Sequence, residues 1–245
     1  MRKLIFIIYL CSVTQLTKAG SVQLSEKEMN QIKQRLEAYE ASKLSFDEIS
    51  GTVNVTNMAL LTNMTAYFRM RSNDVTTKML LPISRCFVIV GEYSDARALA
   101  QRYLNVHSND CRGWNILFVA NDNAESYDAA VQTGTNALSF GCEENLPALG
   151  AAALRVHRTD VLENLVIPRM LAKKDSDPDS QYRQEMRTFL AYYSVISTNE
   201  TLFVKALRGV KRNDVGPGSD LGRCIKEGCE LFKTKEAERI CRELN

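Results

Sequence analysis

Hydrophobic residues along most of the chain recur every three or four positions, a spacing that predicts helices rather than strands. The first such stripe comprises Met29, Ile32, Leu36 and Tyr39. Ser25 and Glu28 lie just before it with the Ser-x-x-Glu spacing of a helix capping box. Glycine and proline number only 12 and 5 among 245 residues, and both disrupt helix interiors. The sequence therefore predicts an all-α fold.

One segment of the chain is repeated at a constant offset. Residues 91–96 (GEYSDA) align with residues 125–130 (ESYDAA), an offset of 125 − 91 = 34. The same offset takes Leu80 to Trp114 and Leu104 to Leu138. Each period is expected to form two helices. The first period gives helices at residues 75–90 and 96–106, and the second gives helices at residues 113–120 and 127–138. Asp110 is expected to cap the third of these helices.

The repeated motif resembles the tetratricopeptide repeat over residues 75–142. The matching positions are Trp114 and Leu117 early in a first helix, Gly91-Glu92-Tyr93 at the turn, Ala96 and Ala130 after it, and Ala137-Leu138 near the end. This chain departs from the family pattern where Glu125 replaces the turn glycine and Gly134 replaces an aromatic residue. Ser108 and Cys142 stand where proline is common. The resemblance implies a right-handed superhelical solenoid of antiparallel helix pairs.

The first nineteen residues have the order of a cleavable secretory signal peptide. Arg2 and Lys3 precede an apolar run over residues 4–13, and small Ala19 ends the segment. The run is shorter than a membrane-spanning helix, and no later segment is long and apolar enough for stable insertion of the mature chain. Cleavage removes three cations and no acid, which leaves 28 − 29 = −1 in place of the formal +2. We therefore expect an exported protein, periplasmic or secreted, that binds no nucleic acid.

Three parts of the chain follow from these signals. Residues 1–19 form the signal peptide, residues 20–212 a tetratricopeptide-like helical repeat domain, and residues 213–245 a C-terminal helical hairpin that caps it. Gly216-Pro217-Gly218 is the clearest linker between the last two. Between Leu44 and Val55 the helical spacing is poor, and residues 51–53 are expected to form a loop.

Six cysteines remain after cleavage, in a compartment that permits disulfides. Cys224 and Cys241 lie at similar distances from a hairpin turn near residue 233, so they are expected to face each other. Cys111 and Cys142 form a second candidate pair, because they lie at helix ends that should meet. Cys86 and Cys229 are expected to be free, packed thiols, and the alternative is that all six are buried thiols.

No catalytic, metal or cofactor site is expected. The chain has no H-E-x-x-H, G-x-x-x-x-G-K, G-x-G-x-x-G or G-x-S-x-G motif. His107 and His157 have no nucleophile or orienting acid assigned to them, and the acidic run at residues 175–179 lacks the spacing of a calcium loop. Sequons at Asn54, Asn63 and Asn199 would mark exposed surface in a eukaryotic secretory protein.

A repeat solenoid of the kind that the resemblance implies binds a peptide or partner helix in a groove lined by its first helices. The residues expected on that wall are Lys78, Arg85, Ile89, Arg112, Asn115, Val119 and His157. We therefore expect a non-catalytic exported protein that mediates protein–protein interaction or scaffolding. The alternative is an exported all-α enzyme that acts on cell-envelope polymer, with Glu125-Ser126 as in lytic transglycosylases. A purely structural subunit of an envelope assembly is a third hypothesis.

Overall fold

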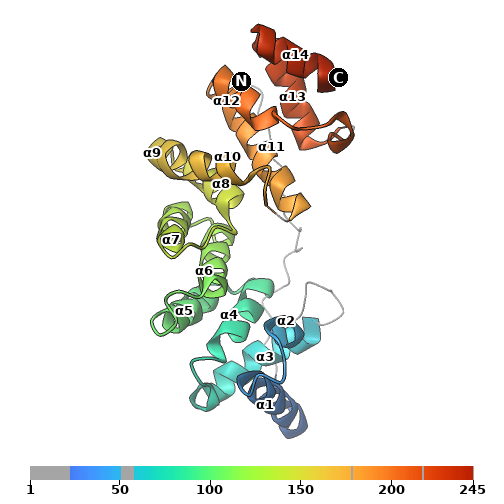
Figure 1. Cartoon of the computed structure of the whole chain (residues 1–245). Helices are drawn as coiled ribbons and strands as arrows, with labels where there is room; N and C mark the ends of the chain where they lie inside the picture. The colour runs from blue at the N-terminus through green and yellow to red at the C-terminus, as the bar shows by residue number, and fades with distance from the viewer. Residues whose placement is uncertain (1–22, 51–57, 178, 217, 245) are drawn as a thin grey trace. The chain divides into compact units, whose positions relative to one another are not determined.

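The computed structural model describes residues 23–50, 58–177, 179–216 and 218–244 (Figure 1). The segment expected to be a signal peptide lies outside these residues. Over the described ranges the chain is helical and contains no β-strand, which confirms the all-α prediction. None of the described helices is both long enough and apolar enough to cross a bilayer. The chain forms two compact units, of which unit 1 ends at Ile116 and unit 2 begins at Leu117.

Unit 1 is built from α1 (Glu26–Glu40), α2 (Phe46–Ser50), α3 (Met58–Arg71), α4 (Leu80–Ile89), α5 (Tyr93–Leu104) and the start of α6 (Cys111–Asn123). Helix α1 packs on α2 and α3, α3 packs on α4, and α4 packs on α5. The Ser25–Glu28 capping box at the start of α1 is confirmed. Helix α4 begins five residues later than expected because Thr76 and Thr77 close two tight turns before it.

Unit 2 is built from α7 (Tyr127–Ser139), α8 (Leu146–Arg155), α9 (Thr159–Val161), α10 (Ile167–Lys173), α11 (Ser180–Ile196), α12 (Glu200–Leu207), α13 (Asp220–Leu231) and α14 (Lys235–Leu244). A π-helical segment (Leu162–Val166) joins α9 to α10 just before Pro168. Helices α7 and α8 pack together, and α11 packs on both α12 and α13. One apolar cluster joins α11 and α12 to the α13–α14 hairpin, through residues such as Ala191, Phe203 and Ile240.

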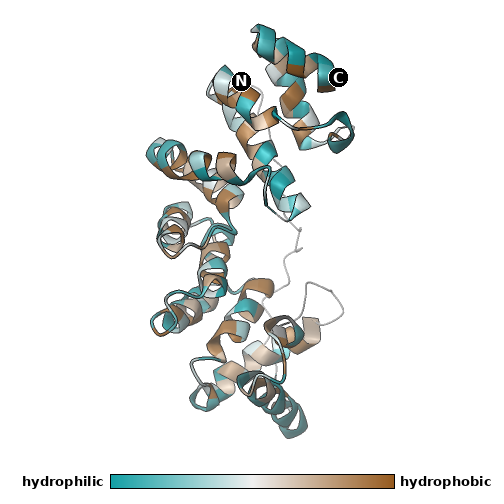
Figure 2. Cartoon of the chain, viewed as in Figure 1, coloured by the Kyte–Doolittle hydropathy of each residue, from teal (hydrophilic) through white to brown (hydrophobic). Residues whose placement is uncertain are grey.

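The positions that repeat in the sequence are buried in the structure. Leu80 and Trp114 are 2% and 9% exposed, and Ala96 and Ala130 are fully buried. In Figure 2 many of the helices carry both hydrophobic and hydrophilic residues. In α14, for example, the buried residues Ala237, Ile240, Cys241 and Leu244 lie on one face. Asp110 caps α6 as expected, because its carboxylate accepts a hydrogen bond from the Arg112 N–H at 3.0 Å.

Several helix ends close with the same turn. Among them, Gly91, Glu125, His157 and Thr198 have left-handed backbone conformations, with φ of 83°, 56°, 56° and 50°. After each of these residues the next N–H donates to the carbonyl five residues back, as in Glu92 to Phe87, Ser126 to Asn121, Arg158 to Ala153, and Asn199 to Ser194. This is the Schellman closure of a helix C-terminus. Glu125, which replaces the turn glycine of the repeat motif, therefore keeps the glycine's backbone conformation.

The cysteines pair differently from one prediction. Cys241 is bonded to Cys229, with their Cα atoms 5.8 Å apart, and Cys224 is a buried free thiol. The predicted Cys224–Cys241 pair is therefore wrong, and so is the prediction that Cys229 is free. Phe232 ends α13 in an extended conformation, and the register across this turn brings Cys229 rather than Cys224 opposite Cys241. Cys111 and Cys142 are both disulfide-bonded, and Cys86 is free and buried as expected.

The turn geometry predicts opposite effects for two substitutions. Glu125→Gly should raise the free energy of unfolding by about 0.5–1 kcal/mol, because glycine adopts positive φ without the Cβ clash. Gly91→Ala should lower it by about 1 kcal/mol for the converse reason, although no atom lies within 4 Å of the added Cβ. Urea denaturation of both variants measures the two shifts. A stabilised Gly91→Ala variant would contradict the assignment.

The cysteine arrangement predicts which thiols react. Burial raises the pKa of both Cys86 and Cys224 to about 12, so both should resist iodoacetamide in the native chain at pH 8. After unfolding in guanidinium without reductant, both should be alkylated while Cys229 and Cys241 stay protected. Mass spectrometry of the digested chain reads the result. Protection of Cys224 together with alkylation of Cys229 would restore the predicted pairing instead.

Candidate partner-binding surfaces of unit 1

Three cations of the expected groove lie on unit 1 and face aromatic rings of the chain itself. The guanidinium carbon of Arg85 lies 4.8 Å from the ring centre of Phe46, and that of Arg112 lies 5.7 Å from it. The Lys78 ammonium lies 5.7 Å from the ring centre of Tyr39. Each such contact contributes about 0.5–1 kcal/mol where it is exposed to water. The α1–α2 segment therefore covers this part of the expected wall.

Asp110 organises the cation nearest to α6. Its two carboxylate oxygens accept hydrogen bonds from Arg112 at 3.0 and 2.6 Å, and one also accepts from the Tyr103 hydroxyl at 2.6 Å. Burial alone would raise the pKa of Asp110, but the hydrogen bonds from Arg112 and Tyr103 outweigh it and hold the pKa below its ordinary value. The carboxylate in turn raises the pKa of Arg112. Asp110 thus holds Arg112 against Phe46 as a fixed cation.

The other residues of the expected groove belong to different surroundings. Ile89 and Asn115 are half-buried in unit 1. Val119 packs against the apolar cluster of unit 2. His157 is exposed in the left-handed turn after α8.

Helix α2 was not expected from the sequence, since it falls in the stretch with poor helical spacing. Its start repeats the capping box of α1, because the Ser45 N–H donates to the Glu48 carboxylate at 2.7 Å and the Glu48 N–H donates to the Ser45 hydroxyl at 3.2 Å. Ile49 is fully buried. The Ser-x-x-Glu spacing is therefore the signal that would have found this helix.

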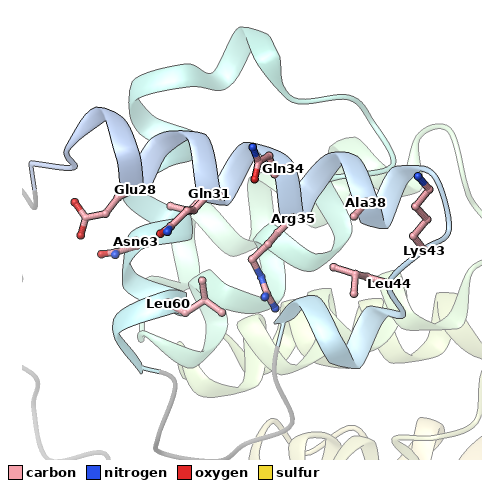
Figure 3. A pocket seen from close by; sticks show the side chains of 10 residues that line it. Glu28, Gln31, Gln34, Arg35, Ala38, Lys43, Leu44, Leu60 and Asn63 are labelled. Carbon is pink, nitrogen blue, oxygen red and sulfur yellow. The ribbon is translucent and has the colours of Figure 1, made fainter.

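A pocket of about 600 Å³ lies between α1, α3 and the turn that leads into α2. Its lining residues are Glu28, Gln31, Ile32, Gln34, Arg35, Ala38, Lys43, Leu44, Leu60 and Asn63. Figure 3 shows Arg35 reaching from α1 towards α2, with Leu60 and Asn63 on α3. We call it the α1–α3 pocket. The sequence did not predict this pocket, because its lining residues come from two separate helices and from a turn. The turn leads into the stretch whose helical spacing is poor.

Polar groups of the α1–α3 pocket differ in how well they are satisfied. The Glu28 carboxylate accepts hydrogen bonds from the Ser25 N–H and hydroxyl at 2.8 and 2.7 Å, and these bonds lower the pKa of Glu28. Arg35 donates one hydrogen bond to the Glu48 carbonyl at 2.9 Å. Its Nε is buried and has no hydrogen-bond partner. The acid is therefore already engaged, while the guanidinium retains an unmet donor.

Unit 2 has a second hollow of about 730 Å³ with balanced charge. Its charged lining residues are Asp175, Asp177, Arg183, Arg187, Lys211 and Asp214. Asp175 accepts hydrogen bonds from buried Lys174 at 2.6 Å and from Arg187 at 2.8 Å. Three acids and three cations line it, so it offers little preference for a ligand of either sign.

The residues considered for other chemistry lie apart from these pockets or serve local structure. Glu125 is exposed in the turn between α6 and α7. Asp179 caps α11, and Asn199 caps α12 through a 2.9 Å hydrogen bond from the Leu202 N–H. Asn63 lines the α1–α3 pocket, and the sequon at Asn54 lies outside the described residues.

No protein-family model, curated protein or solved structure matches this chain.

The Asp110 network predicts a pH-dependent contribution to stability. Because the pKa of Asp110 is lowered in the folded state, its carboxylate stabilises the fold above the unfolded pKa of about 3.9 and loses this effect as pH falls through the lower folded value. Asp110→Asn should therefore lower the free energy of unfolding by about 1 kcal/mol at pH 7. The difference from wild type should shrink below about pH 4.

Urea denaturation at pH 7 and pH 3.5 measures this difference. Asp74→Asn is the matched control, because Asp74 is an exposed acid of the same unit and its replacement should change stability by less than about 0.5 kcal/mol at either pH. A loss in Asp110→Asn that is equal at both pH values would contradict the ionic account.

Proposed function

We propose that this chain is an exported, non-catalytic helical-repeat protein that binds another protein or peptide, with unit 1 as the binding region. The observation that carries the proposal is the α1–α3 pocket, which combines aliphatic side chains with polar groups and a buried, unsatisfied Arg35 Nε. Its volume of about 600 Å³ falls within the range of about 300–1,000 Å³ typical of ligand sites.

Repeat architecture is supported by recurrent local structure rather than by a family match. Several helix ends share one turn geometry and one hydrogen-bond pattern. Small Gly134 lies where an added Cβ would approach Leu149 of the next helix to 2.7 Å, so α7 and α8 pack closely. The right-handed solenoid remains a prediction. It would provide extended surfaces of the kind that repeat proteins use to bind partners.

Export is supported by the oxidised cysteines. Cys229 and Cys241 are bonded to each other, and Cys111 and Cys142 are disulfide-bonded too. Such bonds persist in oxidising compartments such as the periplasm or the extracellular space. The signal-peptide pattern of residues 1–19 agrees with that placement.

Affinity capture from the native compartment tests the proposal when it is run with a pair of variants on α3. Leu60→Glu places a charge in the α1–α3 pocket, whereas Ala59→Glu makes the same change at an exposed neighbour. A partner retained by the wild-type chain and by Ala59→Glu should be lost with Leu60→Glu. Circular dichroism checks that both variants stay helical.

Two results would contradict the proposal. Equal capture by Leu60→Glu and Ala59→Glu would remove the pocket from the interaction. Release of soluble fragments from peptidoglycan by the wild-type chain, abolished in Glu125→Gln, would contradict the non-catalytic assignment.

A further inference from the structure

We infer that the α1–α3 pocket binds an extended peptide segment of the partner protein in which a carboxylate side chain neighbours an aliphatic one. The inference rests on the proposed function and specifies the chemistry of the partner. Three features of the pocket carry it, namely its charge, the unmet donor of Arg35 and the apolar side chains around it.

The charge of the pocket favours an acidic ligand. Arg35 and Lys43 are its cations, and Glu28 is its one acid. Glu28 is held by two hydrogen bonds from Ser25 at the start of α1, so it serves the helix cap. Arg35 makes its hydrogen bond to a backbone carbonyl, that of Glu48, rather than to a carboxylate. The lining therefore has a net charge of 2 − 1 = +1, which a ligand carboxylate would complement. The Glu48 carboxylate also interacts with the charge of Arg35, but Ser45 holds it in the cap of α2.

Arg35 fixes where such a carboxylate would bind. A buried N–H without an acceptor is unfavourable, and the Nε of Arg35 is such a group. The guanidinium is planar and can donate two parallel hydrogen bonds to one carboxylate. Figure 3 shows this side chain extending from α1 towards α2, between the residues that line the pocket. Arg35 as a whole is only half-buried, so a ligand carboxylate would pair with the accessible part of its guanidinium while the Glu48 carbonyl keeps its own bond.

The remaining lining residues favour a peptide over a small anion. Ile32 is buried, and Leu44 and Leu60 are half-buried, so the pocket offers apolar surface to one aliphatic side chain. Gln31 and Asn63 present amides that can both donate and accept hydrogen bonds. An extended peptide backbone needs both kinds of partner, whereas an inorganic anion needs donors alone.

The other charged surfaces are less suited to this ligand. Arg85 and Arg112 face the ring of Phe46, and Asp110 binds Arg112. The hollow of unit 2 is lined by equal numbers of acidic and basic side chains, and Asp175 forms an ion pair with Arg187 within it. The α1–α3 pocket thus differs from the hollow of unit 2 by its excess of positive charge. It differs from the surface at Phe46 because the cations there already face an aromatic ring of the chain.

Selection from a displayed library of random decapeptides on the purified full chain tests the inference. Enriched peptides should place an aspartate or glutamate next to a leucine, isoleucine or valine. A synthetic, fluorescein-labelled copy of the most enriched peptide then gives dissociation constants by fluorescence anisotropy. Replacing its acid with the corresponding amide should weaken binding by roughly tenfold or more.

Variants of the chain identify the residues involved. Arg35→Gln should weaken binding of the labelled peptide by roughly tenfold or more, and Arg35→Lys by less because it keeps the charge. Lys43→Gln should weaken it by roughly twofold to fivefold, since it removes a charge at an exposed position. Lys33→Gln on α1 is the matched control and should leave binding unchanged, because Lys33 is exposed outside the pocket.

Arg35→Gln also removes the hydrogen bond to Glu48, so its thermal midpoint is measured beside its affinity. Lys43→Gln is the second variant, because the hydrogen bonds that hold α2 do not involve the Lys43 side chain. A loss of affinity in this variant therefore cannot be attributed to a displaced α2. The inference is overturned if no peptide is enriched, if enriched peptides lack acids, or if they bind Arg35→Gln as tightly as wild type. In those cases the affinity-capture experiment decides about the proposed function separately. If capture of a partner is lost with Leu60→Glu, the proposed function stands. If capture is unchanged with Leu60→Glu, the proposed function is refuted.

Discussion

The fold depends on the burial of one apolar stripe from each short helix against its neighbours. The described helices run from 3 to 17 residues, and isolated helices shorter than about 12–15 residues are marginal in water. Helix α14 illustrates the constraint, since its buried residues Ala237, Ile240, Cys241 and Leu244 lie on one face of an otherwise polar segment. Such a helix is stable only when it packs on α12 and α13.

Tight turns make that packing possible with little connecting chain. The left-handed residue at each of the similar turns reverses the chain while satisfying helix carbonyls that would otherwise lack donors. Glu125 adopts this conformation without the freedom of glycine, which shows that packing of the flanking helices outweighs local preference there. Where small residues such as Gly150 meet a large neighbour such as Phe189, helices approach closely.

The short helix α2 also decides which cations of unit 1 contact other groups of the chain. Helix α2 has only five residues, and Phe46 packs below Arg85 and Arg112 while Ile49 enters the core. On the α1 side, Arg35 reaches the Glu48 carbonyl, where a cation is favoured by the partial negative charge of the helix C-terminus. One short segment therefore covers cations on one side and leaves a partly satisfied guanidinium in the α1–α3 pocket on the other.

Local chemistry that depends on neighbouring residues could be predicted from the sequence. The Ser25–Glu28 capping box, the Asp110 cap and the burial of the repeated positions all follow from spacing over three to four residues or from a period of 34. The same reasoning overlooked α2, although Ser45 and Glu48 carry the capping-box spacing, because five residues hold too little periodic signal.

Sequence alone thus determined the helical class, the caps at Ser25 and Asp110 and the turn at Gly91, since backbone hydrogen bonds and φ preferences act within a few residues. Only the tertiary structure decided the partner of Cys241, the contacts of Arg85 and Arg112 with Phe46, and the assembly of the α1–α3 pocket. Each of these joins side chains from different helices or turns. Their proximity is set by the register and angle at which apolar stripes pack, and that information is absent from the spacing within any one helix.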